Sequence, residues 1–390
     1  MVHFQPMKLA RTRLRDEVSR LLEQFRGVLL VGPRQVGKTT LARSFVAAGS
    51  ANYFDLEDPV VAEQLRRPLS VLEGLRGLVV IDEVQHAPQL FPVLRVLMDR
   101  DDAPARFLLL GSAAMALLRQ GSESLTGRLA VVEVAGFNLE EAGVANANAL
   151  WQRGGYPLSY LAADEEQSRE WRERFVDLFV QRDLPQLGIN VAAPAMRRFW
   201  MMLAHYHGQV WNAADPARSL GVNESTVRRY LDWLTQTYMV RQLQPWHANV
   251  GKRQVKAPKV YFRDSGLLHT LMGVRSQAEL LHHPRLGASW EGYALEQVLR
   301  LARPDAAYFW ATHTGAELDL LMFKHGKRVG VEFKHVDAPT LTRSMGIAFS
   351  DLALDALYVV YPGSRRYALA DRMEAVPLQQ FAAAPEAPST

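Results

Sequence analysis

The chain has 390 residues, of which 48% are hydrophobic and 22% are charged, and its formal net charge is +4. These values are typical of a globular protein and predict roughly two to four domains. The absence of cysteine excludes disulfide bonds and thiolate metal sites. No segment has the length and apolar character of a membrane span, and the basic first residues lack a signal-peptide core. We therefore expect a cytoplasmic protein that does not enter a membrane.

A phosphate-binding loop follows the first apolar run. Residues 28–31 predict a buried parallel strand, and the loop from Gly32 to Thr39 fits the pattern G-x-x-x-x-G-K-[ST]. In this pattern the loop N–H groups hold phosphates, Lys38 reaches the β and γ oxygens, and Thr39 binds Mg²⁺. Residues 41–46 have the apolar spacing of a following helix. We therefore predict an ATP site made by Gly32, Pro33, Arg34, Gln35, Val36, Gly37, Lys38, Thr39 and Thr40.

A second nucleotide motif is LVVIDEV at 78–84, in which an apolar run ends in Asp82 and Glu83. We expect Asp82 to hold Mg²⁺ and Glu83 to polarise the attacking water. The alternative is a buried strand that merely ends in acids. The end of RFLLLGSAA (106–114) places Ser112 beside the phosphates, and the order of these runs predicts one strand between the two Walker strands. The pattern predicts Mg²⁺-dependent ATP hydrolysis.

Arg128 ends the segment SESLTGR. An arginine that reaches the γ-phosphate of a neighbouring subunit stabilises the transition state of ATP hydrolysis. We expect Arg128 to act as such a catalytic finger within a homo-oligomer, for example a hexameric ring. Arg182, in QRDLP, is a second candidate, and an ordinary surface arginine is the alternative.

Six motifs occur along the chain: GPRQVGKTTL, IDEVQHAPQLFPVLRVLMD, LLGSAA, SLTGR, GGYP and RDLP. With them the chain resembles the bacterial and archaeal AAA-type ATPases that carry a DUF4143 C-terminal region. This resemblance covers nearly the whole chain. It implies an AAA+ module, a helical lid, a winged-helix region and a C-terminal nuclease-like fold. One departure is that the sensor position carries Ser112 where the broader AAA+ pattern has asparagine.

A helix-turn-helix pattern spans residues 213–240. A short helix, a turn with Gly221 and a second helix are predicted, and Asn223 is the expected N-cap. The second helix has one apolar face, formed by Val227, Tyr230, Leu231 and Leu234. We expect its polar face to contact DNA through Ser225, Arg228 and Arg229.

A basic loop at 251–256 follows, between strand-like runs within residues 240–264. It fits the wing of a winged helix, and we expect Lys252, Arg253 and Lys256 to meet DNA phosphates. Residues 196–263 hold eleven Lys or Arg and three Asp or Glu, so eleven minus three gives a local charge of +8. Such a segment in a nearly neutral chain indicates a polyanionic partner. The alternative is a winged helix that serves as an interdomain strut.

The C-terminal third has the order helix, three strands, helix, strand, which is the core order of the PD-(D/E)XK nuclease fold. The matching positions for a nuclease site are Glu291, Asp319, Glu332 and Lys334. In that fold the acids hold Mg²⁺ and the lysine orients the water. Glu332 and Lys334 point to the same face of one strand, as this chemistry requires. Many domains of this fold keep the shape and bind without cleaving.

The predicted fold is α/β with four domains and a tail. The boundaries are 1–135 for the P-loop AAA+ domain, 136–190 for a helical lid, 191–275 for the winged helix, 276–381 for the nuclease-like domain and 382–390 for a disordered tail.

Three functions remain open at this point. The first is a DNA-binding ATPase that uses Mg-ATP to translocate or remodel DNA, including branched DNA such as Holliday junctions. The second is an ATP-gated, metal-dependent nuclease of the defence or restriction type. The third is a signalling ATPase switch with a protein partner, for which DNA affinity and its salt dependence are not expected.

Overall fold

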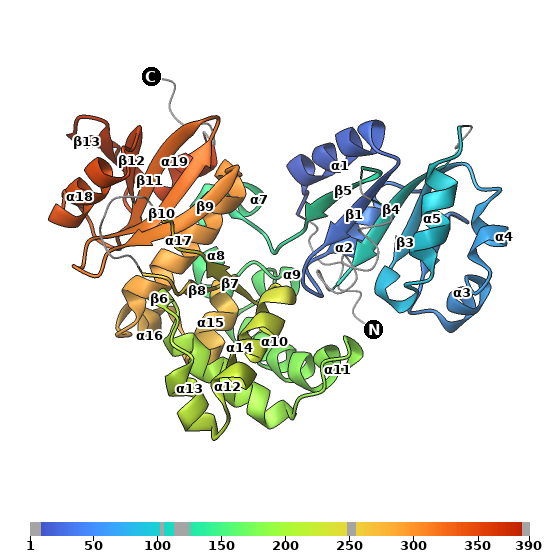
Figure 1. The fold of residues 1–390 in the computed structure, drawn as a ribbon, viewed down its shortest axis with the longest axis horizontal. Coiled ribbons are helices and arrows are strands. Elements are labelled where there is room, and N and C mark those ends of the chain that lie inside the picture. The colour runs from blue at the N-terminus through green and yellow to red at the C-terminus, as the bar shows by residue number, and fades with distance from the viewer. Residues whose placement is uncertain (1–8, 102–104, 113–124, 126, 248–254, 384–390) are drawn as a thin grey trace. The chain divides into compact units, whose positions relative to one another are not determined.

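The computed structural model describes residues 9–101, 105–112, 125, 127–247 and 255–383. The chain forms two compact units (Figure 1). The first comprises residues 1–136 with 236–238, and the second comprises 137–235 with 239–390. In the described ranges no helix has both the length and the apolar character needed to cross a bilayer.

The first unit is an α/β layer built on a five-stranded parallel sheet. The strand order is β2-β3-β4-β1-β5, so β4 separates β1 from β3, as the sequence predicted. Its elements in chain order are α1 Thr12–Gln24, β1 Gly27–Val31, α2 Lys38–Arg43, β2 Tyr53–Asp55, α3 Pro59–Gln64, α4 Pro68–Leu72, β3 Gly77–Asp82, η1 Val84–His86, α5 Leu90–Met98, β4 Ala105–Gly111 and β5 Leu129–Glu133.

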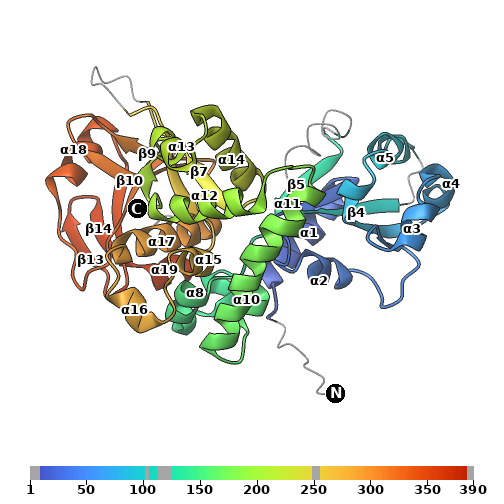
Figure 2. The same cartoon turned by 90° about the horizontal axis from the view of Figure 1, so that it is seen from below.

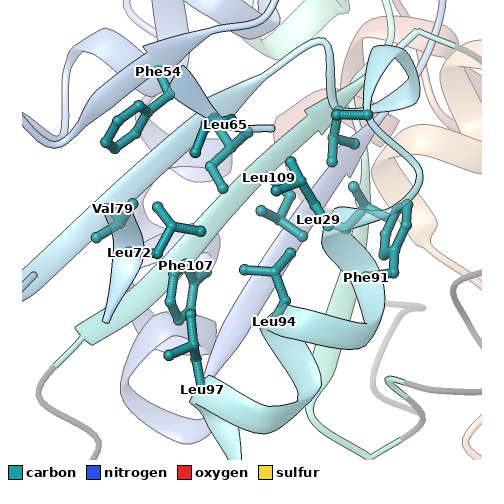
Figure 3. Close-up of a cluster of buried hydrophobic side chains, with 14 of the residues drawn as sticks. Leu29, Phe54, Leu65, Leu72, Val79, Phe91, Leu94, Leu97, Phe107 and Leu109 are labelled. Atoms are coloured by element: carbon teal, nitrogen blue, oxygen red, sulfur yellow. The ribbon is translucent and has the colours of Figure 1, made fainter. Parts of the chain in front are cut away.

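The core of this unit lies between the sheet and helix α5. Strands β1, β3 and β4 are apolar runs, as expected for parallel strands that are buried on both faces. Figure 3 shows Leu94 and Leu97 of α5 directed toward Phe107 and Leu109 of β4. All four side chains are buried. This packing fixes the carboxyl ends of β1 and β3 at one edge of the sheet.

Arg11 connects the phosphate loop to the end of the first unit. Its guanidinium donates to the carbonyl of Val36 at 3.1 Å and to those of Ala135 at 2.9 Å and Gly136 at 3.4 Å. Gly32 also lies against this segment, because a Cβ at Gly32 would meet the carbonyl oxygen of Val134 at 2.0 Å. The loop and residues 134–136 are therefore held together by direct contacts.

The second unit begins with helices and ends with a mixed sheet. Its elements are α7 Leu139–Ala142, η2 Val144–Asn146, α8 Ala147–Arg153, α9 Pro157–Tyr160, α10 Glu165–Leu178, the π-helical η3 Phe179–Asp183, α11 Leu184–Gln186, α12 Ala193–His205, β6 Gln209–Val210, α13 Ala214–Leu220, α14 Glu224–Gln236, β7 Val240–Leu243, β8 Lys259–Phe262, α15 Ser265–Leu271, α16 Gln277–Leu281, α17 Leu286–Ala302, β9 Ala306–Ala311, β10 Glu317–Lys324, β11 Lys327–Phe333, α18 Arg343–Asp351, β12 Ala356–Tyr361, β13 Tyr367–Ala370, β14 Met373–Pro377 and α19 Leu378–Ala383.

Helices α13 and α14 are joined by a short turn (Figure 2). Gly221 ends α13 in the left-handed conformation, and the Asn223 side chain accepts from the Thr226 N–H at 2.8 Å. The predicted apolar face of α14 is buried, with Val227 and Leu234 fully so. The antiparallel strands β7 and β8 follow, and β6 completes a three-stranded sheet of order β6-β8-β7.

The last sheet has six strands in the order β13-β14-β12-β11-β10-β9. Strands β9, β10 and β11 are antiparallel neighbours, whereas β12 runs parallel to β11. Helix α17 precedes β9 and helix α18 connects β11 to β12. The observed element order is therefore the helix, three strands, helix and strand that the sequence predicted.

Candidate functional site

The loop between β1 and α2 has the backbone of a phosphate cradle. Gly32, Gln35 and Gly37 have φ values of 146°, 63° and 91°. Glycine adopts such angles without steric cost, and it lets backbone N–H groups approach a ligand closely. Helix α2 is shorter than predicted: it ends at Arg43, and a turn at residues 44 and 45 and a bend at residue 46 follow it.

Lys38 begins α2 and is buried, with 6% of its surface exposed. Its ammonium donates to the carbonyl oxygens of Gly32 at 2.8 Å and Pro33 at 2.7 Å. Burial lowers the pKa of Lys38 to about 8, and the charges of Glu83 and Asp82 oppose this shift only in part. Its present partners are neutral backbone groups, which an anionic phosphate can replace.

Asp82 ends β3 beside the loop and accepts three hydrogen bonds. Its Oδ2 accepts from Thr39 Oγ1 at 2.8 Å and from the Tyr53 hydroxyl at 2.7 Å, and its Oδ1 accepts from the Glu83 N–H at 3.0 Å. Burial raises the pKa of this carboxyl. A threonine hydroxyl beside a buried carboxylate is the donor set that Mg²⁺ takes at a P-loop, so these residues fit Mg-ATP. Tyr53 was not predicted.

Glu83 lies at the N-terminus of η1 with φ 53°. Non-glycine residues rarely adopt this left-handed conformation, and such strain is frequent at functional sites. The Gln85 side-chain amide donates to the Glu83 carboxylate and, at 2.7 Å, to Ser112 Oγ. Ser112 directly follows β4. The predicted catalytic acid and the predicted sensor serine are thus joined by Gln85, which sequence reasoning missed.

Arg128 lies at the amino ends of strands β1 and β5, opposite to the carboxyl ends where the phosphate loop lies. Its carbonyl accepts from the N–H of Gly27, the first residue of β1, whereas the phosphate loop follows the last residue of β1. With a rise of about 3.3 Å per residue, the two edges are more than about 13 Å apart. The Arg128 guanidinium donates to Asp99 Oδ2 at 2.9 Å. Arg128 therefore lies away from the phosphate loop of its own chain. Arg182, in η3, is exposed.

The predicted DNA-contacting residues of α14 share an exposed face. Ser225, Arg228 and Arg229 are exposed. Arg228 pairs with Glu224 at 3.1 Å, and the Arg229 guanidinium lies 5.2 Å from the centre of the Trp233 ring. Lys256 is exposed, and Lys252 and Arg253 lie outside the described residues.

Several of the cations that give residues 196–263 a local charge of +8 pair with acidic side chains of the protein itself. Arg241 and Arg263 contact the buried carboxylate of Glu296, and Lys259 is buried among other acids. Arg197 also pairs with Asp177 at 3.0 Å, so among the described residues at least four of the eleven cations that were counted toward a polyanionic partner have acidic partners outside residues 196–263. The sequence-based charge overstates what this segment presents to a ligand.

The four residues predicted for a nuclease site lie together. Lys334 Nζ contacts Glu332 Oε1 at 2.8 Å, and Glu332 Oε2 accepts from the Asp319 N–H at 3.3 Å. Burial and the charge of Asp319 raise the pKa of Glu332 to about 8, and the same two causes raise the pKa of Glu291 to about 7. No group of three or more His, Asp or Glu side chains in the described ranges is arranged to hold a metal ion.

Lys259 of β8 enters this acidic cluster. Its Nζ lies 3.7 Å from Glu291 Oε1 and 3.5 Å from Asp319 Oδ1, and it also contacts Glu317. The side chain is 4% exposed. Burial alone would lower the pKa of Lys259. The electrostatic effect of its neighbours Tyr261, Glu291, Asp319 and Glu317 is larger, so the pKa lies well above its usual value. No local pattern indicated this pairing, and Lys259 entered the sequence analysis only as one of the eleven cations counted in residues 196–263.

Comparison with known proteins identifies the family. Residues 24–143 match the model of an AAA domain, and residues 286–381 match a domain of unknown function, DUF4143. Uncharacterized protein Rv2008c of Mycobacterium tuberculosis is 49% identical over 370 residues, which are 94% of this chain and 84% of that protein. The chain belongs to the family of AAA-domain ATPases with a C-terminal DUF4143 region.

Other similarities add detail within this AAA–DUF4143 family. Residues 145–278 match a further domain of unknown function, DUF8612. Uncharacterized protein Mb2031c of Mycobacterium bovis is also 49% identical over the same share of both chains. Among solved structures, a Walker-type ATPase of Pyrococcus abyssi is similar at 15% identity, with a TM-score of 0.47 over 68% of this chain and 96% of that one. RuvB of Thermotoga maritima is similar at 20% identity, with a TM-score of 0.31 over 60% and 90%.

Proposed function

We propose that this AAA–DUF4143 protein hydrolyses Mg-ATP in its first unit and uses the energy to translocate or remodel DNA bound by its second unit. One observation carries the ATPase part. Lys38, Thr39, Asp82 and Glu83 meet at the edge of the sheet where β1 and β3 end. Ligands of open α/β sheets bind at this edge.

Each residue of the ATP site has a distinct proposed role. Lys38 would exchange its backbone carbonyl partners for the β and γ phosphates, while Thr39 and Asp82 would hold Mg²⁺. Glu83 takes the proton of the attacking water. Gln85 orients the Glu83 carboxylate and links it to Ser112, beside the γ-phosphate. Gln85 is therefore a positioning residue.

Two features of the second unit support the DNA part. The elements α12, β6, α13, α14, β7 and β8 occur in the order of a winged helix. The exposed face of α14 also carries Ser225 and two arginines, and such a face suits phosphate and base contacts. We propose that Arg228 and Arg229 contact DNA, with the exposed Lys256 adding a phosphate contact.

A ring of identical chains would complete the ATP site. Arg128 lies at the sheet edge away from its own nucleotide, so it can contribute only to the site of a neighbouring copy. We therefore propose that Arg128 is supplied in trans in a homo-oligomer. The Arg128→Ala chain should then keep ATP binding and lose hydrolysis, and adding Lys38→Ala chains should restore part of the activity in mixed rings.

The experiment that tests the function is an ATPase assay with single-stranded, duplex and four-way-junction DNA. We expect DNA to stimulate hydrolysis and the stimulation to fall as salt rises, because phosphate contacts release counterions. Glu83→Gln should bind ATP and not hydrolyse it. A wild-type hydrolysis rate in Glu83→Gln would refute the assignment of the base.

A double variant separates DNA from a protein partner. Arg228→Ala with Arg229→Ala should remove the DNA stimulation and keep the basal rate. Arg174→Ala is the matched control, because Arg174 pairs with Glu170 at i,i+4 on the exposed side of α10, as Arg228 pairs with Glu224 on α14. If no DNA form binds or stimulates, the signalling switch with a protein partner becomes the better interpretation.

A further inference from the structure

The acidic cluster of the C-terminal sheet already has a cation in it. Lys259 Nζ contacts carboxylates from helix α17 and strand β10, and almost none of its side chain reaches solvent. A buried ammonium is stable only when carboxylates or other acceptors surround it. Glu291, Glu317 and Asp319 provide this environment. The ammonium is therefore a fixed component of the cluster.

The carboxylate oxygens that a divalent ion would need have protein donors. Asp319 Oδ2 accepts from the Phe333 N–H at 3.0 Å, and Glu332 is held through both of its oxygens by Lys334 and the Asp319 N–H. Glu291 Oε1 accepts from the Tyr261 hydroxyl at 2.6 Å. With Lys259 near Asp319 Oδ1, five of the six oxygens of these three acids have a partner.

A divalent ion does not fit this arrangement. Mg²⁺ binds carboxylate oxygens at about 2.0–2.1 Å and keeps an octahedral shell. Such an ion would have to displace several of these hydrogen bonds, and it would then lie beside a buried ammonium of the same sign. Repulsion between like charges is strong where water is excluded.

The connection that leads from β7 to the strand of Lys259 is attached to the same sheet by its backbone. The Trp246 N–H donates to the Phe309 carbonyl at 2.7 Å, and the Phe309 N–H donates to the Gln244 carbonyl at 3.0 Å. On the other side of the β7–β8 connection, the Val255 N–H donates to the Ala311 carbonyl at 3.3 Å. Strand β9 therefore holds both sides of this connection.

We propose that Lys259 is the resident cation of the acidic cluster, so that the C-terminal sheet binds no divalent metal there and serves to anchor the β7–β8 hairpin instead of cutting nucleic acid. Residues that resemble a nuclease site thus act as an ion-pair clamp. This inference does not depend on DNA binding, since it concerns only the cation that the cluster holds.

The test measures Mn²⁺ binding to the full-length chain without nucleotide, and electron paramagnetic resonance detects the bound ion. In the wild-type background, Asp319→Asn and Glu332→Gln should leave Mn²⁺ binding unchanged. Lys259→Met should gain an Mn²⁺ site that a further Asp319→Asn change removes. Lys256→Met is the matched control, because Lys256 is exposed on the same connection and its loss should create no site.

Several outcomes would overturn the proposal. One is wild-type Mn²⁺ binding that Asp319→Asn abolishes, and another is Mg²⁺- or Mn²⁺-dependent DNA cleavage that needs Asp319. A folded Lys259→Met chain without a new Mn²⁺ site would also contradict it. If Lys259→Met does not fold, the two acid variants in the wild-type background still decide the question, since their folding does not depend on removing the lysine.

Discussion

Lys38 and Lys259 are both buried lysines beside carboxylates, but their immediate partners differ. The Lys38 ammonium donates to two backbone carbonyls of the phosphate loop, whereas the Lys259 ammonium contacts three carboxylates. As a result the pKa of Lys38 is lowered to about 8 by burial, and the pKa of Lys259 lies above its usual value.

This difference separates a lysine that awaits a ligand from one that is already satisfied. A charge with only neutral partners costs folding free energy and gains when a phosphate arrives. A charge that carboxylates surround stabilises the fold and has no capacity for another anion. Two buried lysines, each with carboxylates nearby in the fold, thus differ in whether those carboxylates contact the ammonium.

The largest effect is expected for Lys38→Met, which should lower ATP hydrolysis by about 100-fold or more because phosphate charge is no longer neutralised.

The same variant should change stability. The pKa of Lys38 near 8 in the folded chain lies below the unfolded value of 10.5. The contribution of Lys38 to stability is therefore most favourable above pH 10.5 and is lost as pH drops through 8. At pH 7 we expect Lys38→Met to gain roughly 1–3 kcal/mol in the free energy of unfolding, measured by urea denaturation. A clear loss of stability in Lys38→Met would contradict the contrast between Lys38 and Lys259.

Lys259→Met should have the opposite effect on stability. Removing one partner of a buried ion cluster leaves unpaired carboxylates and should cost about 3–5 kcal/mol in the free energy of unfolding. Because its pKa is raised, the contribution of Lys259 is fully present below pH 10.5 and disappears only as pH rises through the folded value. Urea denaturation at pH 7 measures it, with Lys256→Met expected within about 0.5 kcal/mol of wild type. A folded Lys259→Met chain should still hydrolyse ATP.

Glu296 has the opposite arrangement to Lys259. It is a buried carboxylate surrounded by arginines, one of which is Arg241. Burial raises the pKa of Glu296, yet the charges of Arg241, Arg263 and Arg300 lower it to about 2. A shift from 4.5 to about 2 corresponds to about 3 kcal/mol. This stability is present above pH 4.5 and lost as pH falls toward 2. Glu296→Gln should therefore lose about 3 kcal/mol at pH 7 and match wild type near pH 2 in denaturation experiments, while the exposed Glu170→Gln stays close to wild type throughout.

The smallest effect is expected for Gln85→Ala. Loss of one hydrogen bond to a charged group is worth about 1.5 kcal/mol, so kcat for ATP hydrolysis should fall roughly tenfold. KM should change little, because in the described ranges the Gln85 side chain hydrogen-bonds Glu83 and Ser112 and makes no hydrogen bond to Lys38 or Thr39. Steady-state kinetics with Gln89→Ala as the control tests this. An increased kcat would mean that Gln85 restrains Glu83 and does not position it.

The features that could be predicted from sequence were those encoded locally. The phosphate loop, the acids that end β3 and the apolar face of α14 each occupy a short contiguous stretch, and a motif, an apolar strand run and helical spacing respectively indicated them. Phe45 shows the limit even there, since it kept helical spacing but lies after the end of α2.

The missed residues depend on contacts between distant segments. Tyr53 reaches Asp82 only because β2 pairs with β3, and Lys259 reaches Asp319 only because β8 lies beside the C-terminal sheet. No pattern in the chain distinguishes Lys259 from the exposed Lys256, three residues earlier. Tertiary packing alone assigns one to the interior and the other to the surface.

Arg11 gives the phosphate loop a mechanical role. Its guanidinium binds the loop carbonyl of Val36 and the carbonyls of Ala135 and Gly136, where the chain leaves the first unit. Val134 also lies against Gly32 without room for even a methyl group. A change in the loop conformation would therefore be transmitted to residues 134–136, where the chain leaves the first unit. The Arg11 guanidinium therefore ties the loop to residues 135 and 136 through three carbonyl oxygens.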